Sequence, residues 1–410
     1  DWSSDVCSSD LFLRLVTIRF RECYTNRQHA TSPHHSSPIM ELSAFVKSLR
    51  PLFSQWKSSS KRVLDVVIGN QASDADSIVS SIVYSYMLEA RNRDENRHYI
   101  PLLYISDEKL RFRSEIRVLF QMANIDMSSL LTIQSCMKEL QDGNGRLHFH
   151  LVDHNVLSPE LDCFESQVVE IVDHRKDEGK YPWVCGDNRV ISFDPLIGLG
   201  VGSCCTLIAE KLRANPTRES LPVLATLLEG VILLDTLNLS PTANKTTPRD
   251  VQIVSWLQSL IPQNRDALFT RLFDSKFDPA MWSQMSIRDA FEYDSKVFQR
   301  NGYRIGWSAV LTHLDRYRSQ PSFNDTLKSY CKENQLDAFV FSSVLPQGSP
   351  KREILFCSFN EALDKPLDSA GQLLKERFHA CGKDCFFTTD DPVSRKALAP
   401  LLLDLLSWVV

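Results

Sequence analysis

One stretch of the sequence, residues 63–90, constrains the fold more than any other, because its hydrophobic period changes once. Residues 63–68 form an apolar, largely β-branched run that ends at Gly69, and a helical spacing of apolar residues begins at Ile78. A strand, a loop and a helix in this order form the repeating unit of parallel α/β folds. We therefore predict an α/β protein built on a mostly parallel sheet with helices on both faces.

The loop of this unit carries two aspartates one residue apart, Asp74 and Asp76. They would lie where a parallel sheet opens and where a helix begins, which is the usual place for ligands in such folds. Two close carboxylates repel each other unless a cation lies between them. Because Asp is also an ordinary helix N-cap residue, the loop alone leaves both metal binding and capping open.

Three further acidic residues follow apolar runs. Asp153 and Asp173 end the runs at residues 146–152 and 167–172, which we predict to be strands. Asp235 ends a longer apolar run that fits either a helix or a buried strand. The carboxyl ends of parallel strands meet at one edge of a sheet, so these acids are expected near the first loop.

The resulting cluster of carboxylates also includes His174, which directly follows Asp173. Oxygen ligands with one imidazole favour Mn²⁺ or Mg²⁺, with Co²⁺ as a third candidate. Two such ions about 4 Å apart would activate a water and orient a phosphoryl oxygen for in-line attack. The cluster therefore predicts hydrolysis of a phosphoanhydride or a phosphoester.

The chain is 410 residues long, which favours two domains over one. We predict an N-terminal extension or artefact at residues 1–39, a metal-binding domain at 40–262, a linker at 263–286 and a smaller α+β domain at 287–410. The linker is placed where the pattern loosens and Asp, Pro and Phe interrupt it.

Further elements are predicted from the hydrophobic pattern. Strands are predicted at residues 98–105, 336–343 and 353–359. Helices are predicted at residues 108–123, 306–317 and 392–406, around Leu373, and after a glycine-flanked turn within residues 198–212. His148 and His150 alternate along a predicted strand and are interpreted as ordinary sheet residues.

Composition excludes several classes of protein. The net charge of −5 offers no general attraction to nucleic acids or acidic membranes, and the longest apolar runs are interrupted by Asp235, Pro400 and Asp404. The eleven cysteines are odd in number and scattered, which favours a reducing compartment, and Cys381 and Cys385 lack a second pair at zinc-site spacing. We expect a cytoplasmic monomer that binds neither membranes nor extended nucleic acid; a mitochondrial transit peptide near the N-terminus is the alternative.

The ordered motifs resemble those of the DHH phosphoesterase superfamily, in the branch of eukaryotic exopolyphosphatases and prune proteins, which is related to family II inorganic pyrophosphatases. The four DHH motifs are matched by residues 69–77 (GNQASDADS), 151–155 (LVDHN), 171–175 (IVDHR) and 233–238 (LLDTLN), and the glycine-serine-cysteine turn by residues 202–206 (GSCCT). Residues 293–298 (YDSKVF) and 394–402 (SRKALAPLL) resemble phosphate-binding segments of the accessory domain called DHHA2. The resemblance runs from about residue 40 almost to the C-terminus.

The resemblance implies a metal role for five side chains. Asp74 would bind one ion, Asp76 and His174 the other, and Asp153 and Asp235 both. The last two and His174 would also act in catalysis.

The resemblance also implies a catalytic role for Arg175. This residue is the main departure from the superfamily, because most members have histidine at this position. Histidine can transfer a proton near neutral pH, whereas arginine can only stabilise charge. The resemblance also places Asn70 where pyrophosphatases have a metal-binding histidine, and we count it among the substrate-binding residues.

Three cationic side chains would bind the phosphate chain across a cleft between the domains: Lys296, Arg395 and Lys396. A guanidinium and an ammonium neutralise phosphate oxygens in complementary ways. Without the motif, the Arg395 and Lys396 pair would be interpreted as a solvated helix face.

Three further residues have two interpretations each. His154 either touches the substrate or orients Asp153. Ser203 either belongs to a phosphate-binding helix start or is a plain helix cap. Lys245 either senses the substrate or is an ordinary loop lysine.

The function implied is a metal-dependent exopolyphosphatase that releases orthophosphate from short inorganic polyphosphates, with pyrophosphate and nucleoside polyphosphates as further candidates. One alternative is a nucleotide phosphodiesterase or single-strand nuclease, but their accessory domain has a GGGH-type signature and this chain contains no Gly-Gly pair. The other, suggested by Arg175, is an interaction protein of low activity on the same scaffold.

Overall fold

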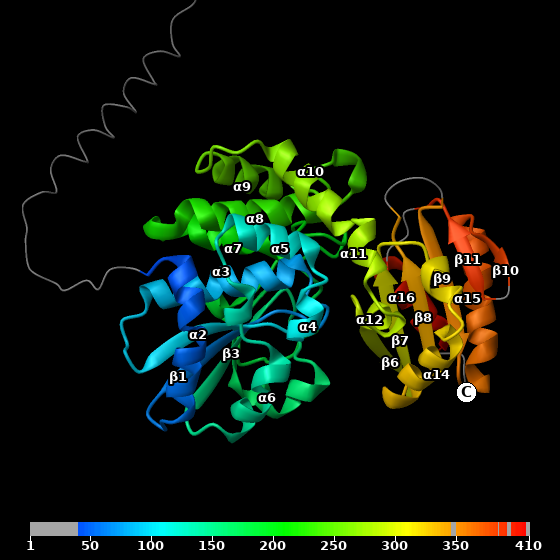
Figure 1. Ribbon diagram of the computed structural model, residues 1–410, viewed down its shortest axis with the longest axis horizontal. Coiled ribbons are helices and arrows are strands. Elements are labelled where there is room, and N and C mark those ends of the chain that lie inside the picture. Colours follow the sequence, from blue (N-terminus) through cyan, green and yellow to red (C-terminus); the bar gives the residue numbers. More distant parts are fainter. Residues whose placement is uncertain (1–39, 346–349, 384, 392–394, 407–410) are drawn as a thin grey trace, which may run out of the picture. The chain divides into compact units, whose positions relative to one another are not determined.

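The computed structural model describes residues 40–345, 350–383, 385–391 and 395–406 (Figure 1). The predicted N-terminal extension, residues 1–39, lies outside the described residues. Two sheets organise the rest, with strand orders β2-β1-β3-β4-β5 and β10-β11-β9-β8-β7-β6.

The first sheet is parallel throughout, as the sequence predicts. Its strands are β1 (Val63–Ile68), β2 (Arg97–Leu102), β3 (Arg146–Val152), β4 (Val168–Asp173) and β5 (Arg189–Ile191). Every residue of β1 is buried, which explains why all its residues but Asp65 are apolar. The short edge strand β5 was not predicted, because three half-buried residues give no periodic signal.

Helices cover this sheet. They are α2 (Leu42–Lys57), α3 (Ala75–Arg91), α4 (Asp107–Leu110), α5 (Ser114–Met122), α6 (Ile133–Asp142), α7 (Cys204–Ala214), α8 (Leu221–Asp235), α9 (Pro248–Gln258) and α10 (Arg265–Lys276). Figure 1 shows α7, α8 and α9 on one side of the sheet and α6 on the other. The single helix predicted at 108–123 is wrong, since the chain turns between α4 and α5, where the side chain of Arg113 enters the interior.

The apolar run that ends at Asp235 is a helix, α8, and not a strand. It packs against α3, α7, α9 and α10, so it is apolar on most faces and gives no clear helical stripe in the sequence. Asp235 therefore lies at the C-terminal end of a helix and not at the end of a strand.

The second sheet is mixed: β7 and β8 are parallel and the other neighbours are antiparallel. Its strands are β6 (Lys296–Arg300), β7 (Tyr303–Val310), β8 (Ala338–Ser343), β9 (Arg352–Ser358), β10 (Cys381–Lys383) and β11 (Phe386–Thr389). Its helices are α11 (Pro279–Ser283), α12 (Ile287–Glu292), α13 (Asp315–Arg318), α14 (Phe323–Glu333), α15 (Asp364–Phe378) and α16 (Arg395–Leu406). Phe339 and Phe341 face one apolar core while Val340 faces another, so both faces of the sheet are covered.

One predicted element of this part is wrong. Residues 306–317 were predicted as a helix, but they contain most of strand β7 and the short helix α13. β7 is buried from Ile305 to Val310, and a short run of this kind has the same hydrophobic pattern as a buried helix. The predicted linker contains all of α10 and α11, and the domain boundaries themselves stay a prediction.

Among the described residues, no helix has the length and apolar character needed to cross a bilayer.

Candidate metal centre

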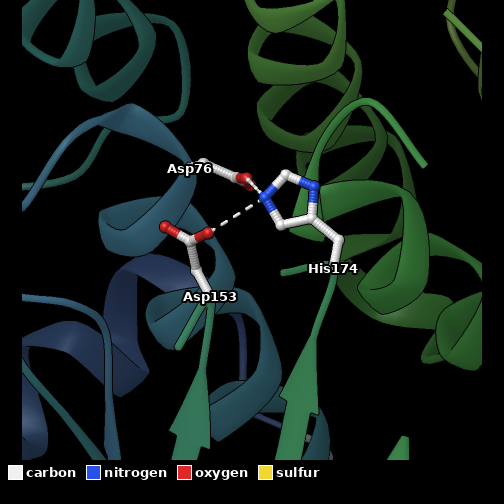
Figure 2. A group of neighbouring side chains, drawn as sticks. All are labelled: Asp76, Asp153 and His174. Carbon is white, nitrogen blue, oxygen red and sulfur yellow. Dashed lines mark ion pairs between the residues drawn. The ribbon is translucent and has the colours of Figure 1, made fainter. Parts of the chain in front are cut away.

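Three predicted ligands, Asp76, Asp153 and His174, meet at the carboxyl edge of the first sheet (Figure 2). Asp76 lies in the first turn of α3, whereas Asp153 and His174 directly follow β3 and β4. His174 Nε2 is 3.2 Å from Asp153 Oδ1 and 3.7 Å from Asp76 Oδ2. All three side chains are buried, and each offers an atom within 4.8 Å of the other two.

Asp153 is the most constrained of the three. Its φ of 60° lies in the left-handed region, which is unusual for a residue other than glycine and typical of functional sites. Its carboxylate accepts hydrogen bonds from Asn70 Nδ2 at 2.6 Å and Ser77 Oγ at 2.7 Å. Burial alone would raise the pKa of Asp153, but Arg175 and His174 outweigh burial and hold it well below its usual range.

Asp76 is held by the start of α7. It accepts hydrogen bonds from the backbone N–H groups of Cys204 at 2.7 Å and Cys205 at 2.8 Å and from Ser203 Oγ at 2.8 Å. Burial, followed by the charge of Asp153, nevertheless raises the pKa of Asp76 to about 6. Ser203 thus fixes a carboxylate and also caps α7, which matches the cap interpretation.

Asp74 and Asp235 lie outside this closest group but near it. The side chain of Asp74 caps α3 by accepting from Ser77 N at 3.1 Å. Asp235 Oδ2 is buried without a hydrogen-bond partner. Burial and then the charges of Asp76 and Asp74 raise the pKa of Asp235 to about 8, so the carboxylates act on one another.

The donor set fits a divalent cation. His174 Nδ1 lies 3.0 Å from the carbonyl oxygen of Val201, and an N–H donated there leaves the Nε2 lone pair directed at the carboxylates. Asp235 adds an unpaired oxygen, and the charges of Asp76 and Asp74 affect its pKa more than that of Lys276 does. Carboxylate oxygens with one imidazole nitrogen suit a hard or borderline dication.

Arg175 binds the same aspartate that the cluster is built on. Its Nη2 donates to Asp153 Oδ1 at 2.7 Å and its Nε donates to the Asp153 carbonyl oxygen at 3.0 Å. His154 belongs to the second motif, and its Nδ1 lies 3.0 Å from the carbonyl oxygen of Val152. Burial lowers the pKa of His154. The structure thus brings Arg175, and not His154, into hydrogen-bond contact with the Asp153 carboxylate.

The predicted cations of the second domain are only partly described. Lys296 is the first residue of β6; burial, followed by the charges of Arg175 and Arg395, lowers the pKa of Lys296 to about 8. Arg395 donates to Asp294 Oδ1 at 2.9 Å. The side chain of Lys396 lies outside the described residues.

Lys245 lies close enough to Asp235 for that charge to act on it. Its side chain is exposed, yet the surrounding protein desolvates the ammonium group and lowers its pKa, and the charge of Asp235 counteracts this shift. Both interpretations of Lys245 stay predictions.

Sequence reasoning missed several residues that position the site. Ser77, within the first motif, donates to Asp153. Asp250 accepts from Gly202 N at 3.0 Å and from Thr206 Oγ1 at 2.6 Å, and so fixes the turn before α7. The capping box formed by Thr247 and Asp250 was the available signal, but it indicates a helix start and nothing more.

Comparison with known proteins adds three findings. Residues 270–405 match the DHHA2 domain family. The chain is 28% identical over 358 residues to exopolyphosphatase PRUNE1 of Homo sapiens, covering 84% of this chain and 76% of the relative. It is also 28% identical over 372 residues to a Schizosaccharomyces pombe protein named as an exopolyphosphatase, covering 84% of this chain and 92% of the relative.

Among solved structures, the fold is similar to a Methanococcus jannaschii protein described as a family II inorganic pyrophosphatase. The TM-score is 0.57 at 21% sequence identity, and the similarity covers 84% of this chain and 99% of the other. The predicted α/β architecture with a DHHA2 domain is therefore confirmed.

Proposed function

We propose that this chain, which belongs to the prune branch of the DHH phosphoesterase superfamily, is a metal-dependent phosphoanhydride hydrolase that removes the terminal phosphate from short inorganic polyphosphates. Relatives named as exopolyphosphatases support the reaction class. The observation that carries the proposal is the buried group of Asp76, Asp153 and His174, which has the donor set of a divalent metal site.

The reaction is a hydrolysis. A water oxygen forms a new bond to the terminal phosphorus while the bridging P–O bond breaks, and the bridging oxygen keeps the electron pair. The products are orthophosphate and a chain one phosphate shorter, with the proton of the water released to solvent or to the leaving oxygen.

The metal set we propose is two divalent cations, Mn²⁺ or Mg²⁺, with Co²⁺ as an alternative. Asp76 and His174 would hold one, Asp74 the other, and Asp153 and Asp235 both. When bound, such ions lower the pKa of water and neutralise charge on the transferred phosphoryl group.

The cationic side chains would then bind the substrate. Lys296, whose pKa is already influenced by Arg175, would join that arginine in neutralising phosphate oxygens, together with Arg395. Phosphoryl transfer depends mainly on positioning and electrostatics, so a histidine is not required where Arg175 stands. Arg175 would stabilise charge and keep Asp153 ionised.

The test is phosphate release from pyrophosphate, tripolyphosphate and longer chains, each measured with Mn²⁺, Mg²⁺ and Co²⁺. We expect release from short chains, and none after chelation with EDTA. A cyclic nucleotide and a short oligonucleotide serve as comparison substrates. Preferential cleavage of either would indicate a phosphodiesterase, and release from none of the compounds with any ion would contradict the proposal.

A further inference from the structure

A cavity of about 360 Å³ lies beside the loop of the first motif. Its lining includes Ala72 from that loop, Lys109 and Arg113 from the segment around α4, and Tyr293 and Lys296 from the second domain. Lys296 is the residue we propose to bind phosphate. Ala72 is two residues from Asn70, which donates to Asp153. The cavity is therefore linked to the metal centre through Ala72, whose N–H donates to Asn70 Oδ1 at 2.8 Å.

Two of the lining side chains hold buried donors without a partner. Arg113 is 4% exposed and its Nε has no hydrogen-bond partner, and Tyr293 is 8% exposed and its hydroxyl has none. Buried donors are nearly always satisfied in native proteins, so an acceptor from water or a ligand is expected at these atoms. Burial raises the pKa of Tyr293 to about 12, so the phenol keeps its proton at neutral pH.

The two donors are held in place by other contacts. Arg113 Nη2 donates to the carbonyl oxygen of Ala72. The guanidinium carbon lies 4.3 Å from the centre of the Tyr293 ring, which is a cation–π distance. Arg113 thereby links the loop of the first motif to Tyr293, which lies three residues before Lys296.

A buried carboxylate near these donors does not satisfy them. Both oxygens of Glu115 are buried and also lack a hydrogen-bond partner. Its charge acts on Arg113 and Tyr293, but none of these groups is within hydrogen-bond distance of it. Bridging water is the alternative explanation, and the experiment below separates it from a ligand.

Carboxylates also line the cavity. Asp289 and Glu292 both line it, and Glu292 is paired with Lys109 at 2.5 Å. Phosphates that came close to Asp289 would be repelled. The cavity suits a few phosphates and not a long chain.

We propose that Arg113 Nε–H and the Tyr293 hydroxyl form a phosphate subsite beyond Lys296, which receives a phosphate distal to the one that is cleaved. The ligand class is a linear phosphoanhydride of three or more phosphates. Pyrophosphate is too short to occupy both the cleavage site and this subsite. The inference rests on the proposed function and names the part of the site that selects chain length.

The test compares Tyr293→Phe with Tyr317→Phe. Tyr317 also has a buried hydroxyl without a partner, but it does not line the cavity, so its variant removes the same group elsewhere in the same domain. The measured quantity is the ratio of kcat/KM for tripolyphosphate to kcat/KM for pyrophosphate. We expect this ratio to fall about tenfold in Tyr293→Phe, the cost of one hydrogen bond to a charged group, and to stay unchanged in Tyr317→Phe.

The outcomes distinguish this inference from the proposed function. If wild type hydrolyses both substrates and Tyr293→Phe leaves the ratio unchanged, water satisfies the hydroxyl and the subsite is refuted. If wild type hydrolyses neither, the proposed function fails. Calorimetric binding of tripolyphosphate then decides the subsite: weaker binding by Tyr293→Phe than by Tyr317→Phe supports it, and equal binding refutes it.

Discussion

Two groups of buried carboxylates, one within the parallel sheet and one at its carboxyl edge, differ in how their charge is balanced. In one, Asp65 of β1 accepts two hydrogen bonds from Arg97, each at 2.7 Å, and Glu170 of β4 lies 3.2 Å from Lys211 Nζ. His150 joins the two acids, since its ring nitrogens lie 2.8 Å from Asp65 and 2.8 Å from Glu170. Every acid in this group has a cationic side chain beside it.

The pKa shifts follow from this pairing. Burial alone would raise the pKa of Asp65, but hydrogen bonds from His148, His150 and Arg97 hold it well below its usual range. The pKa of Glu170 is lowered in the same way, with the contact to His150 outweighing burial. This group is complete without an added ion.

The group at the carboxyl edge is different. Burial and neighbouring acids raise the pKa of Asp76 and of Asp235, and Asp235 keeps a buried oxygen without a partner. Buried charges are stable only when they are paired or bind a metal. The comparison teaches that burial of an acid does not by itself mark a metal site; the missing positive charge does.

The largest expected effect is on activity at the unbalanced group. Asp153→Asn should reduce phosphate release about a thousandfold, because it removes a proposed ligand of both ions and charge stabilisation in the site. The fold should survive, since Asn70 and Ser77 can still bond the amide. Turnover like that of wild type, in a variant with a native circular dichroism spectrum, would refute the assignment.

The balanced group should respond in stability and not in activity. Asp65→Asn leaves the buried His150 and the half-buried Arg97 without their shared acid and should lower the free energy of unfolding by about 3 kcal/mol. Urea denaturation measures this change, and phosphate release per folded molecule should match wild type. A loss of activity without a loss of stability would remove the distinction between the two groups.

Arg175 tests the link between charge balance and catalysis. Arg175→Met removes the donors to Asp153, so we expect kcat/KM to fall roughly tenfold to a hundredfold. Arg175→Lys keeps the charge but not the paired geometry and should recover part of the loss. If Arg175→Met had the same kcat/KM as wild type, Arg175 would only fill space in the site.

The smallest effect is a pH dependence at the balanced group. Burial alone would lower the pKa of His150, but the hydrogen bonds that its ring donates to Asp65 and Glu170 outweigh burial and raise it in the fold. Protonated His150 therefore stabilises the fold fully below its unfolded pKa, about 6.5, and this contribution is lost as pH rises through the folded value. Above pH 6.5, wild type should lose stability more steeply than His150→Gln in thermal melts at increasing pH. Parallel curves would refute this role.

The edge cluster was predictable because each strand-end acid follows an apolar run in the sequence. Asp76, Asp153 and His174 could therefore be placed together from topology alone. His148 and His150 were interpreted as ordinary sheet residues, which missed their contacts with Asp65. An acid in the middle of an apolar strand was the sequence feature that could have indicated these contacts.

Other features depended on tertiary contacts that leave no local pattern. The break before α5 follows from Arg113 reaching the carbonyl of Ala72, 41 residues away in the sequence. The strand at residues 303–310 is set by its neighbours in the second sheet, because its apolar run alone also fits a helix.

The central claim is that the unbalanced carboxylates hold divalent cations, and a calorimetric titration of metal-stripped protein with Mn²⁺ tests it most directly. We predict binding by wild type, binding of the same strength by Asp65→Asn, and binding at least about tenfold weaker by Asp76→Asn. The account would be contradicted if wild type bound no Mn²⁺, or if Asp76→Asn bound it as tightly as wild type.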